Sequence, residues 1–139
     1  MPASIDINVF MDIIFRRKPF VYPAIGVWRQ IDSGHVRGCF VSTTVTTLYY
    51  LVEKHKGSER AREAVARLLE MFEIRPVNRQ VFDLAHSKRF RDFEDAVQDA
   101  AAELANVSVI VTRNAKDFVG STRQIVDADG LIALVESQA

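Results

Sequence analysis

The strongest indication of the fold lies in the stretch FEDAVQDAAAELANVSVIVT, residues Phe93–Thr112. Its first part, Phe93–Ala105, places apolar residues at helical spacing. The part that follows, Val107–Thr112, is a short and strongly apolar run, which is typical of a buried strand. A helix that leads directly into a buried strand is a unit of an α/β protein, so we expect a sheet covered by helices.

The same alternation extends in both directions along the chain. Strands are predicted at Ser4–Asp6, Val36–Val41, Ile74–Val77, Val107–Thr112 and Gln124–Val126. Helices are predicted at Val9–Arg16 (with Asn8 as its N-cap), Pro23–Ile31, Ser42–His55, Glu59–Phe72, Gln80–Lys88, Phe93–Ala105 and Asp129–Val135, and a loop at Arg113–Thr122. Pro76 marks the third strand as an edge strand, because proline cannot donate to a central ladder. Strands that alternate with helices predict a parallel sheet with both faces covered.

Composition narrows the class of protein. The 139 residues predict one domain, spanning residues 1–139, and 18 basic and 18 acidic residues give a net charge of zero. This balance argues against a nucleic-acid binder that relies on bulk positive charge, but not against a nuclease with an acidic site. The single Cys39 excludes an intrachain disulfide and a cysteine zinc site. With no signal-like N-terminus and no apolar run long enough to span a membrane, we expect a cytoplasmic protein.

Acidic and polar residues gather where the predicted strands end. Asp6 ends the first strand, acids open the helix after residue 91, and Thr112 leads into a polar segment that contains Asp117. Ligands of an open parallel sheet bind beyond the carboxyl ends of its strands. Converging carboxylates repel one another unless a divalent cation binds, and oxygen ligands favour Mg²⁺ or Mn²⁺. Such a cation suits phosphoryl transfer.

Each acidic segment also has an explanation without a site. Asp6 and Asn8 suit a helix N-cap, and Asn114–Asp117 suits an Asx turn. The acids of the Phe93–Ala105 helix recur at the spacing of a solvated face, at Asp92, Asp95, Asp99 and Glu103. Position distinguishes them, because only Asp95 among the last three lies in the first turn. We therefore expect Asp95 at the site and Asp99 and Glu103 on the surface.

Three segments together resemble the sequence blocks of PIN domains. They are Asp6–Asp12 (DINVFMD), Asp92–Gln98 (DFEDAVQ) and Val111–Phe118 (VTRNAKDF), and their order and spacing match from residue 4 to about residue 135. The resemblance implies a three-layer α/β/α fold with a central parallel five-stranded sheet. It also implies a Mg²⁺- or Mn²⁺-dependent endoribonuclease that leaves a 5′-phosphate and a 3′-hydroxyl. Many PIN domains are VapC-type toxins, so the resemblance further implies an antitoxin partner and a homodimer. The apolar stretch Leu48–Val52 also suggests a homodimer.

The resemblance assigns roles to individual residues. It makes Asp6, Asp95 and Asp117 the catalytic, metal-binding carboxylates. Supporting positions are Asn8, Asp92, Thr112 and Asn114, together with Thr47. Four cations flank the acids and are candidates to hold the RNA backbone, with ordinary surface charge as the alternative: Arg89, Arg91, Arg113 and Lys116.

One position departs from the pattern. Many PIN nucleases carry a further glutamate early in the helix after the second strand, where this chain has Thr47. Glu53 comes nearly two turns later, about 9 Å along the helix axis, and is a poor substitute. The sequence thus resembles a PIN branch without this glutamate, for which we expect weak activity. The main alternative is a degenerate PIN domain that binds RNA or a protein without cleavage. A receiver-like signalling domain is disfavoured, since Asp6 has no acidic neighbour in its strand.

Overall fold

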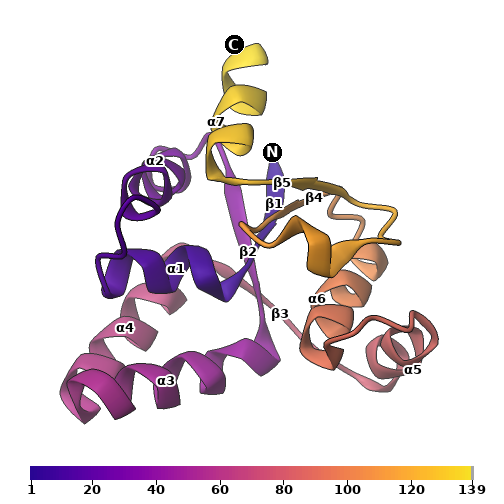
Figure 1. The fold of residues 1–139 in the computed structure, drawn as a ribbon, viewed down its shortest axis with the longest axis horizontal. Helices are drawn as coiled ribbons and strands as arrows, with labels where there is room; N and C mark the ends of the chain where they lie inside the picture. Colours follow the sequence, from indigo (N-terminus) through magenta and orange to yellow (C-terminus); the bar gives the residue numbers. More distant parts are fainter. Residues whose placement is uncertain (139) are drawn as a thin grey trace.

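Five short segments form a fully parallel sheet in the computed structural model, which describes residues 1–138 (Figure 1). They are β1 (Pro2–Ile5), β2 (Arg37–Val41), β3 (Glu73–Arg75), β4 (Val109–Val111) and β5 (Gln124–Val126). Their order across the sheet is β3-β2-β1-β4-β5. The predicted five-stranded parallel sheet is therefore confirmed. The strand predicted at Ile74–Val77 is β3, which ends at Arg75, just before Pro76, and lies at an edge as expected.

Helices connect the strands and cover both faces of the sheet. Within residues 1–138 they are α1 (Ile7–Ile14), α2 (Val21–Asp32), α3 (Ser42–Lys56), α4 (Ser58–Met71), α5 (Arg79–Ser87), α6 (Phe93–Leu104), α7 (Ala128–Ser137) and a short 3-10 turn, η1 (Ala115–Phe118). No helix in this part of the chain has both the length and the apolar character needed to cross a membrane.

Side chains of the strands alternate between two cores. Ala3, Ile5 and Phe40 pack with α1–α4 and α7 on one face. Cys39 and Ile110 point to the opposite face, which α5 and α6 cover (Figure 1). Cys39 is buried, as its apolar surroundings predict. This period of two produces the three-layer α/β/α arrangement.

The strand order creates a crevice at the centre of the sheet. From β1 the chain builds outward through β2 to β3, then returns to the other side of β1 to form β4 and β5. Connections therefore leave β1 and β4 in opposite directions, so the carboxyl ends of these two strands form the switch point of the sheet. Such a switch point is where ligands bind in open α/β sheets.

Two local predictions differ from the structure near this crevice. The first helix begins at Ile7 rather than at Val9, and Asp6, not Asn8, occupies the N-cap position. The reason is that β1 ends at Ile5, so the backbone turns into the helix at once. The segment predicted as a loop after Thr112 contains η1, which gives Asp117 a defined backbone position.

Candidate active site

Asp6 and Thr112 meet in the crevice between the two central strands. Asp6 follows β1, Thr112 follows β4, and both are buried. The Thr112 hydroxyl donates a hydrogen bond of 2.6 Å to Asp6 Oδ2. Two residues predicted from the sequence are thus in direct contact at the switch point of the sheet.

The Asp6 carboxylate is held in place by several donors. Burial raises the pKa of Asp6 above its ordinary value. The Thr112 hydroxyl, the backbone amides of Asn8 and Ile7, and the charge of Arg113 lower the pKa but do not cancel the rise. Asn8 therefore supports Asp6 through its backbone.

Asp95 enters the same region from the first turn of α6. The Asp92 carboxylate caps this helix by accepting hydrogen bonds from the backbone amides of Glu94 (2.8 Å) and Asp95 (3.3 Å). The pKa of Asp95 is raised to about 7, first by burial and then by the charges of Asp92, Asp6, Asp117 and Glu94. Carboxylates from three separate segments therefore lie close enough to repel one another.

Asp117 reaches the cluster from η1. The Thr112 hydroxyl accepts a hydrogen bond of 3.1 Å from the Asn114 amide, so the same oxygen joins Asp6 to the start of this turn. The Asn114 carbonyl in turn accepts a hydrogen bond from the Asp117 amide at 2.9 Å. Thr112 and Asn114 thus fix the segment that carries Asp117, as supporting residues would.

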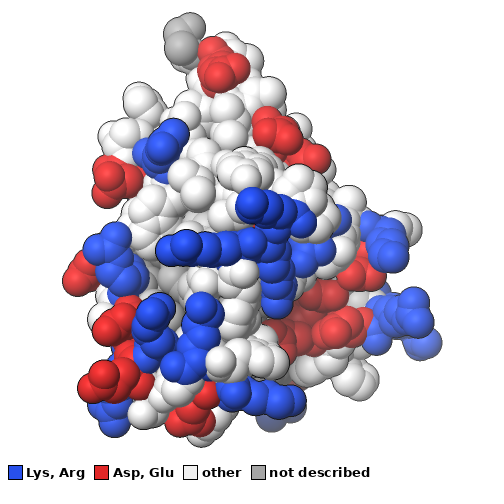
Figure 2. Space-filling model, turned by 60° about the vertical axis from the view of Figure 1, so that its left-hand side comes forward, with Lys and Arg blue, Asp and Glu red and all other residues white. Residues whose placement is uncertain are grey.

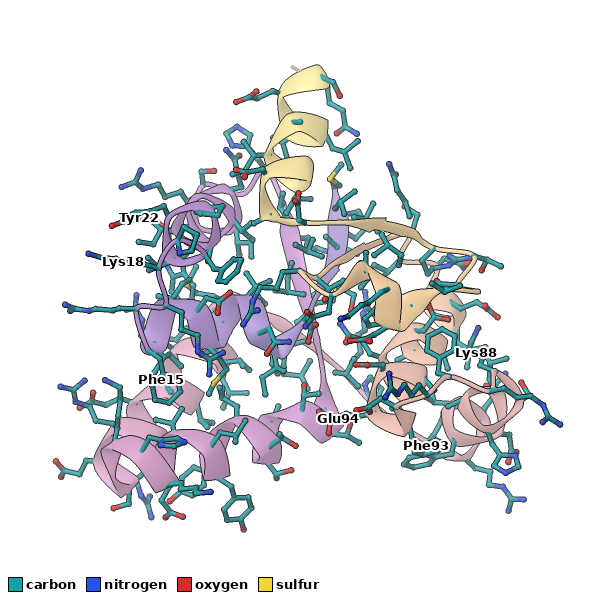
Figure 3. The ribbon with its side chains drawn as sticks, in the orientation of Figure 1. Phe15, Lys18, Tyr22, Lys88, Phe93 and Glu94 are labelled. Atoms are coloured by element: carbon teal, nitrogen blue, oxygen red, sulfur yellow. The ribbon has the colours of Figure 1, made fainter. Side chains whose placement is uncertain are left out.

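Glu94 is a site candidate that sequence reasoning left out. Its pKa is raised by burial and by the charges of Asp92 and Asp6, so its carboxylate lies near the cluster. In Figure 3, Glu94 extends from the start of α6 toward the middle of the molecule. The signal available in the sequence was the run of acids in the first helical turn. Thr47 is half-buried on α3, and Glu53 is exposed on the same helix.

The four predicted cations have different surroundings. Arg89, Arg91 and Lys116 are exposed. Arg113 instead binds the buried Asp12 carboxylate through two hydrogen bonds, of 3.1 and 3.3 Å, and its guanidinium lies 4.4 Å from the centre of the Phe20 ring. Figure 2 shows acidic side chains gathered in a hollow of the surface, with Lys and Arg side chains on either side.

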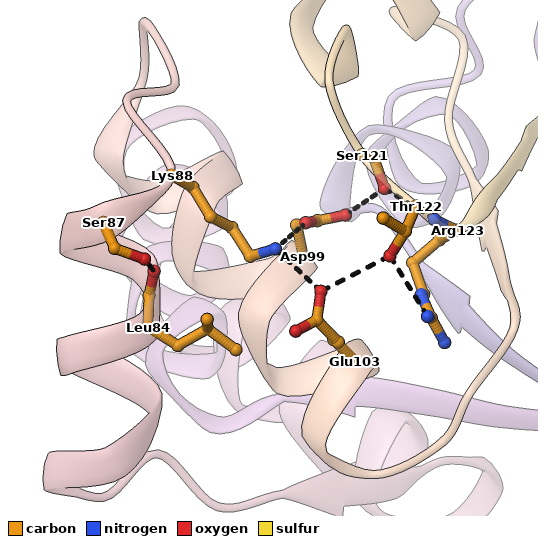
Figure 4. A network of polar contacts seen from close by, with 8 residues as sticks. All are labelled: Leu84, Ser87, Lys88, Asp99, Glu103, Ser121, Thr122 and Arg123. Atoms are coloured by element: carbon orange, nitrogen blue, oxygen red, sulfur yellow. Dashed lines mark hydrogen bonds and ion pairs between the residues drawn. The ribbon is translucent and has the colours of Figure 1, made fainter.

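Asp99 and Glu103 were expected on the surface, and this expectation is wrong. Asp99 is completely buried, and Glu103 is half-buried. The Lys88 ammonium lies 2.9 Å from each carboxylate, Ser121 donates to Asp99, and Thr122 donates to Glu103 (Figure 4). The turn after η1 and the loop after α5 fold over this face of α6, which the spacing of the acids does not reveal.

The donor groups at this end of the sheet are those that a hard cation prefers. They are carboxylate, hydroxyl and amide oxygens, and the repulsion that acts on Asp95 is what a cation would relieve. Among residues 1–138, no three His, Cys, Asp or Glu side chains stand close enough together to hold a metal ion. Mg²⁺ usually uses one or two carboxylates and retains several waters, so the donor set fits this type of ion.

Comparison with known protein families gives one family for the chain. The model described as "PIN domain" matches residues 3–116. The matched segment contains Asp6, Asp95 and Thr112 and ends one residue before Asp117. A search of curated proteins gives no match.

Solved structures share the fold at low sequence identity. VapBC2 from Rickettsia felis, bound to a promoter DNA fragment, matches with a TM-score of 0.70 and 18% identity over 91% of this chain and 98% of that one. VapBC-1 from Haemophilus influenzae matches with a TM-score of 0.69 and 18% identity over 93% and 99%. VapC20 from Mycobacterium tuberculosis, described as a toxin that cleaves the sarcin–ricin loop, matches with a TM-score of 0.63 and 15% identity over 78% and 86%. All three confirm the α/β/α architecture.

Proposed function

This chain belongs to the PIN domain family, and we propose that it is an endoribonuclease that depends on Mg²⁺ or Mn²⁺. The observation that carries the proposal is the contact of Thr112 with Asp6 at the switch point of the sheet, in a region where the charges of Asp6 and Asp117 also act on Asp95. The likeness to a toxin described as cleaving RNA supports RNA as the substrate.

Asp6, Asp95 and Asp117 would hold the cation in part through its retained waters, because the three carboxylates are not close enough together to bind it directly by themselves. When bound, the cation would activate water and neutralise charge on the scissile phosphate. The chain's own residues set the geometry, because Thr112 fixes Asp6 and Asn114 fixes the turn that carries Asp117. The exposed Arg89, Arg91 and Lys116 would hold the RNA backbone on either side of the acids.

Glu94 would supply the carboxylate that Thr47 lacks. It lies on α6 rather than on α3, and the charge of Asp6 is one of the causes that raise the pKa of Glu94. A second acidic residue in the same turn as Asp95 thus offers an outer ligand, to the ion or to one of its waters. On this proposal the departure at Thr47 weakens activity without abolishing it.

Asp6→Asn tests the proposed function. We expect it to abolish Mn²⁺-dependent cleavage of single-stranded RNA while the fold survives, because asparagine keeps the shape and relieves repulsion. Asp83→Asn is the matched control, since Asp83 is an exposed carboxylate that pairs with Arg79 on α5. Calorimetric titration with Mn²⁺ separates the alternatives. A parent protein that binds RNA but neither binds Mn²⁺ nor cleaves is the degenerate PIN domain.

We also propose that the chain is the toxin of a toxin–antitoxin pair and acts in the cytoplasm. Solved structures with the same fold are described as toxin–antitoxin complexes, which supports an antitoxin partner. The test is co-expression with the neighbouring reading frame, followed by purification on a tag carried by this chain. A product that co-purifies and suppresses cleavage is the antitoxin.

A homodimer is the remaining proposal for assembly. Tyr50 and Leu51 of α3 and Leu69 of α4 are large apolar side chains exposed to solvent. The two helices pack against each other, so these side chains can form one surface. Sedimentation of the parent and of Tyr50→Glu tests this surface, and a monomeric parent would contradict it.

A further inference from the structure

Two exposed phenylalanines lie beside the acidic site. Phe82 of α5 is 41% exposed, and Phe93, the first residue of α6, is 51% exposed. Their rings are almost parallel, with 6° between the planes and 6.4 Å between the centroids. A single exposed apolar side chain is common on a protein surface, but two stacked aromatic rings that both remain partly exposed form an aromatic surface that could serve in binding.

The loop that joins these two residues presents two cations. Along Lys88–Arg91 the side chains alternate between the interior and solvent. Lys88 pairs with buried Asp99, and Phe90 packs edge-on against Phe118 with 6.0 Å between the ring centroids. Arg89 and Arg91, which alternate with them, are exposed. The inward residues anchor the loop, so both arginines leave it from a fixed backbone.

Phe93 is placed directly next to the acids. It lies between Asp92, which caps α6, and Glu94, which lies near Asp6. Figure 3 shows Glu94 and Phe93 leaving the start of α6 in different directions, Glu94 toward the middle of the molecule and Phe93 toward α5. A nucleic-acid strand that brings a phosphate to the acids and continues toward α5 therefore crosses the two rings.

We propose that Phe82 and Phe93 stack against an unpaired base of the RNA substrate, with Arg89 and Arg91 on its phosphates. Aromatic faces combined with cations that follow the backbone are how proteins bind single strands. Stacking tolerates any base, so this surface selects for unpaired RNA rather than for sequence. The inference rests on the proposed function, because RNA is the ligand that the adjacent acids are proposed to cleave. The charges favour RNA over a second copy of the chain, since Arg89 and Arg91 match phosphates.

The experiment measures affinity for a fluorescent 12-nucleotide single-stranded RNA by anisotropy, in Mg²⁺ and in an Asp6→Asn background. Loss of one base–aromatic stack weakens binding by about 5- to 150-fold, and we expect this for Phe93→Ala. Phe93→Leu, which keeps apolar volume without a flat face, is expected to lose almost as much, and Phe93→Trp to retain affinity. Tyr22→Ala is the matched control, because Tyr22 is an exposed aromatic on α2, away from α6 (Figure 3).

An abasic scan of the RNA locates the stacked base. An abasic nucleotide at one position should weaken binding to the Asp6→Asn protein, yet have no further effect once Phe93 is alanine. Equal affinity of the Ala, Leu and Trp variants overturns the inference, as does a dimeric parent that Phe93→Ala converts to a monomer. The proposed function is judged separately, by cleavage with Asp6 intact. A parent that cleaves while Phe93→Ala binds normally leaves the function standing, and a parent that neither binds nor cleaves RNA removes both.

Discussion

The two ends of helix α6 hold carboxylates of one stripe in opposite environments. In the first turn, burial and then the charges of neighbouring carboxylates raise the pKa of Asp95 to about 7. Later in the helix, Asp99 and Glu103 share the Lys88 ammonium, 2.9 Å from each. Acidic residues at helical spacing are thus repelled by neighbouring carboxylates at one end of α6 and paired with an ammonium group at the other.

This difference in environment distinguishes carboxylates with a structural role from those that are candidates for a functional role. Compensated carboxylates hold segments together, here α6, the loop after α5 and the turn after η1 (Figure 4). Carboxylates that repel one another destabilise the folded protein, and a bound cation would offset that repulsion. Such carboxylates are therefore candidates for a functional role. Substitutions at the two ends should therefore change stability in opposite directions.

Asp99→Ala should have the largest effect. It removes a completely buried carboxylate and leaves the Lys88 ammonium with one partner fewer, so the free energy of unfolding should fall by about 3–5 kcal/mol. Urea denaturation at pH 7 measures the change. Asp83→Ala is the control, because the exposed Asp83–Arg79 pair should contribute nothing measurable. If Asp99→Ala and the control have the same free energy of unfolding, the pairing of Asp99 with Lys88 does not stabilise the fold, and the contrast between the two ends of α6 fails.

Asp95→Asn should act in the opposite direction. The folded protein binds the Asp95 proton more tightly than the unfolded chain does, so the parent loses stability as pH rises from 3.8 to about 7. Asparagine does not ionise, so the variant does not lose this stability as pH rises. In EDTA at pH 8 the variant should therefore be more stable than the parent, by roughly 1 kcal/mol because Asp95 is partly exposed. Melting curves at pH 5 and pH 8 decide this, and a variant less stable than the parent at pH 8 would make Asp95 a structural residue.

Thr47→Glu should give a smaller, metal-dependent effect. A glutamate early in α3 adds a charge at the end of the sheet where Asp6 lies, so it should lower the melting temperature in EDTA. Bound Mn²⁺ should return that loss and produce a larger rise than in the parent. Thr46→Glu, on the exposed side of α3, is the control. An equal Mn²⁺ response in both variants would show that position 47 does not face the cluster.

Glu103→Gln should have the smallest effect. The hydrogen bond from Lys88 lowers the pKa of Glu103, so the pair stabilises the fold above the ordinary value of 4.5, and this contribution is lost as pH falls below it. The variant should lose less than about 1 kcal/mol at pH 7, and the difference from the parent should shrink toward pH 3. Urea denaturation at both pH values measures it. A difference that grows in acid would contradict the assigned pairing.

Much of this fold could be predicted from the sequence, because its signals are local. The apolar run Val107–Thr112 contains β4, and the periodicity after residue 92 gives α6 to within one residue. Contacts between distant segments carry no such local signal. The spacing that suggested a solvated face for Asp99 could not show that Lys88 and Ser121 would cover it.

Some residues of the candidate site could likewise be predicted from local motifs, and others could not. Family motifs selected Asp6 and Thr112, which the structure brings into contact. Motifs did not single out Glu94, because its relevance depends on the direction in which its side chain leaves α6. Its position beside the acids made Arg113 a candidate to hold RNA, and the sequence could not show that its guanidinium also binds Asp12 and lies over Phe20.

The hydrogen bond between Thr112 and Asp6 has a consequence for the timing of synthesis. Its partners are 106 residues apart in the chain, and Asp117 follows later still. A protein emerges from the ribosome with its N-terminus first, so Asp6 is made before β4 and η1. A growing chain therefore lacks the full donor set until η1 has been synthesised. For a proposed RNA-cleaving enzyme, this order delays the onset of cleavage until η1 has been synthesised and has folded beside β4.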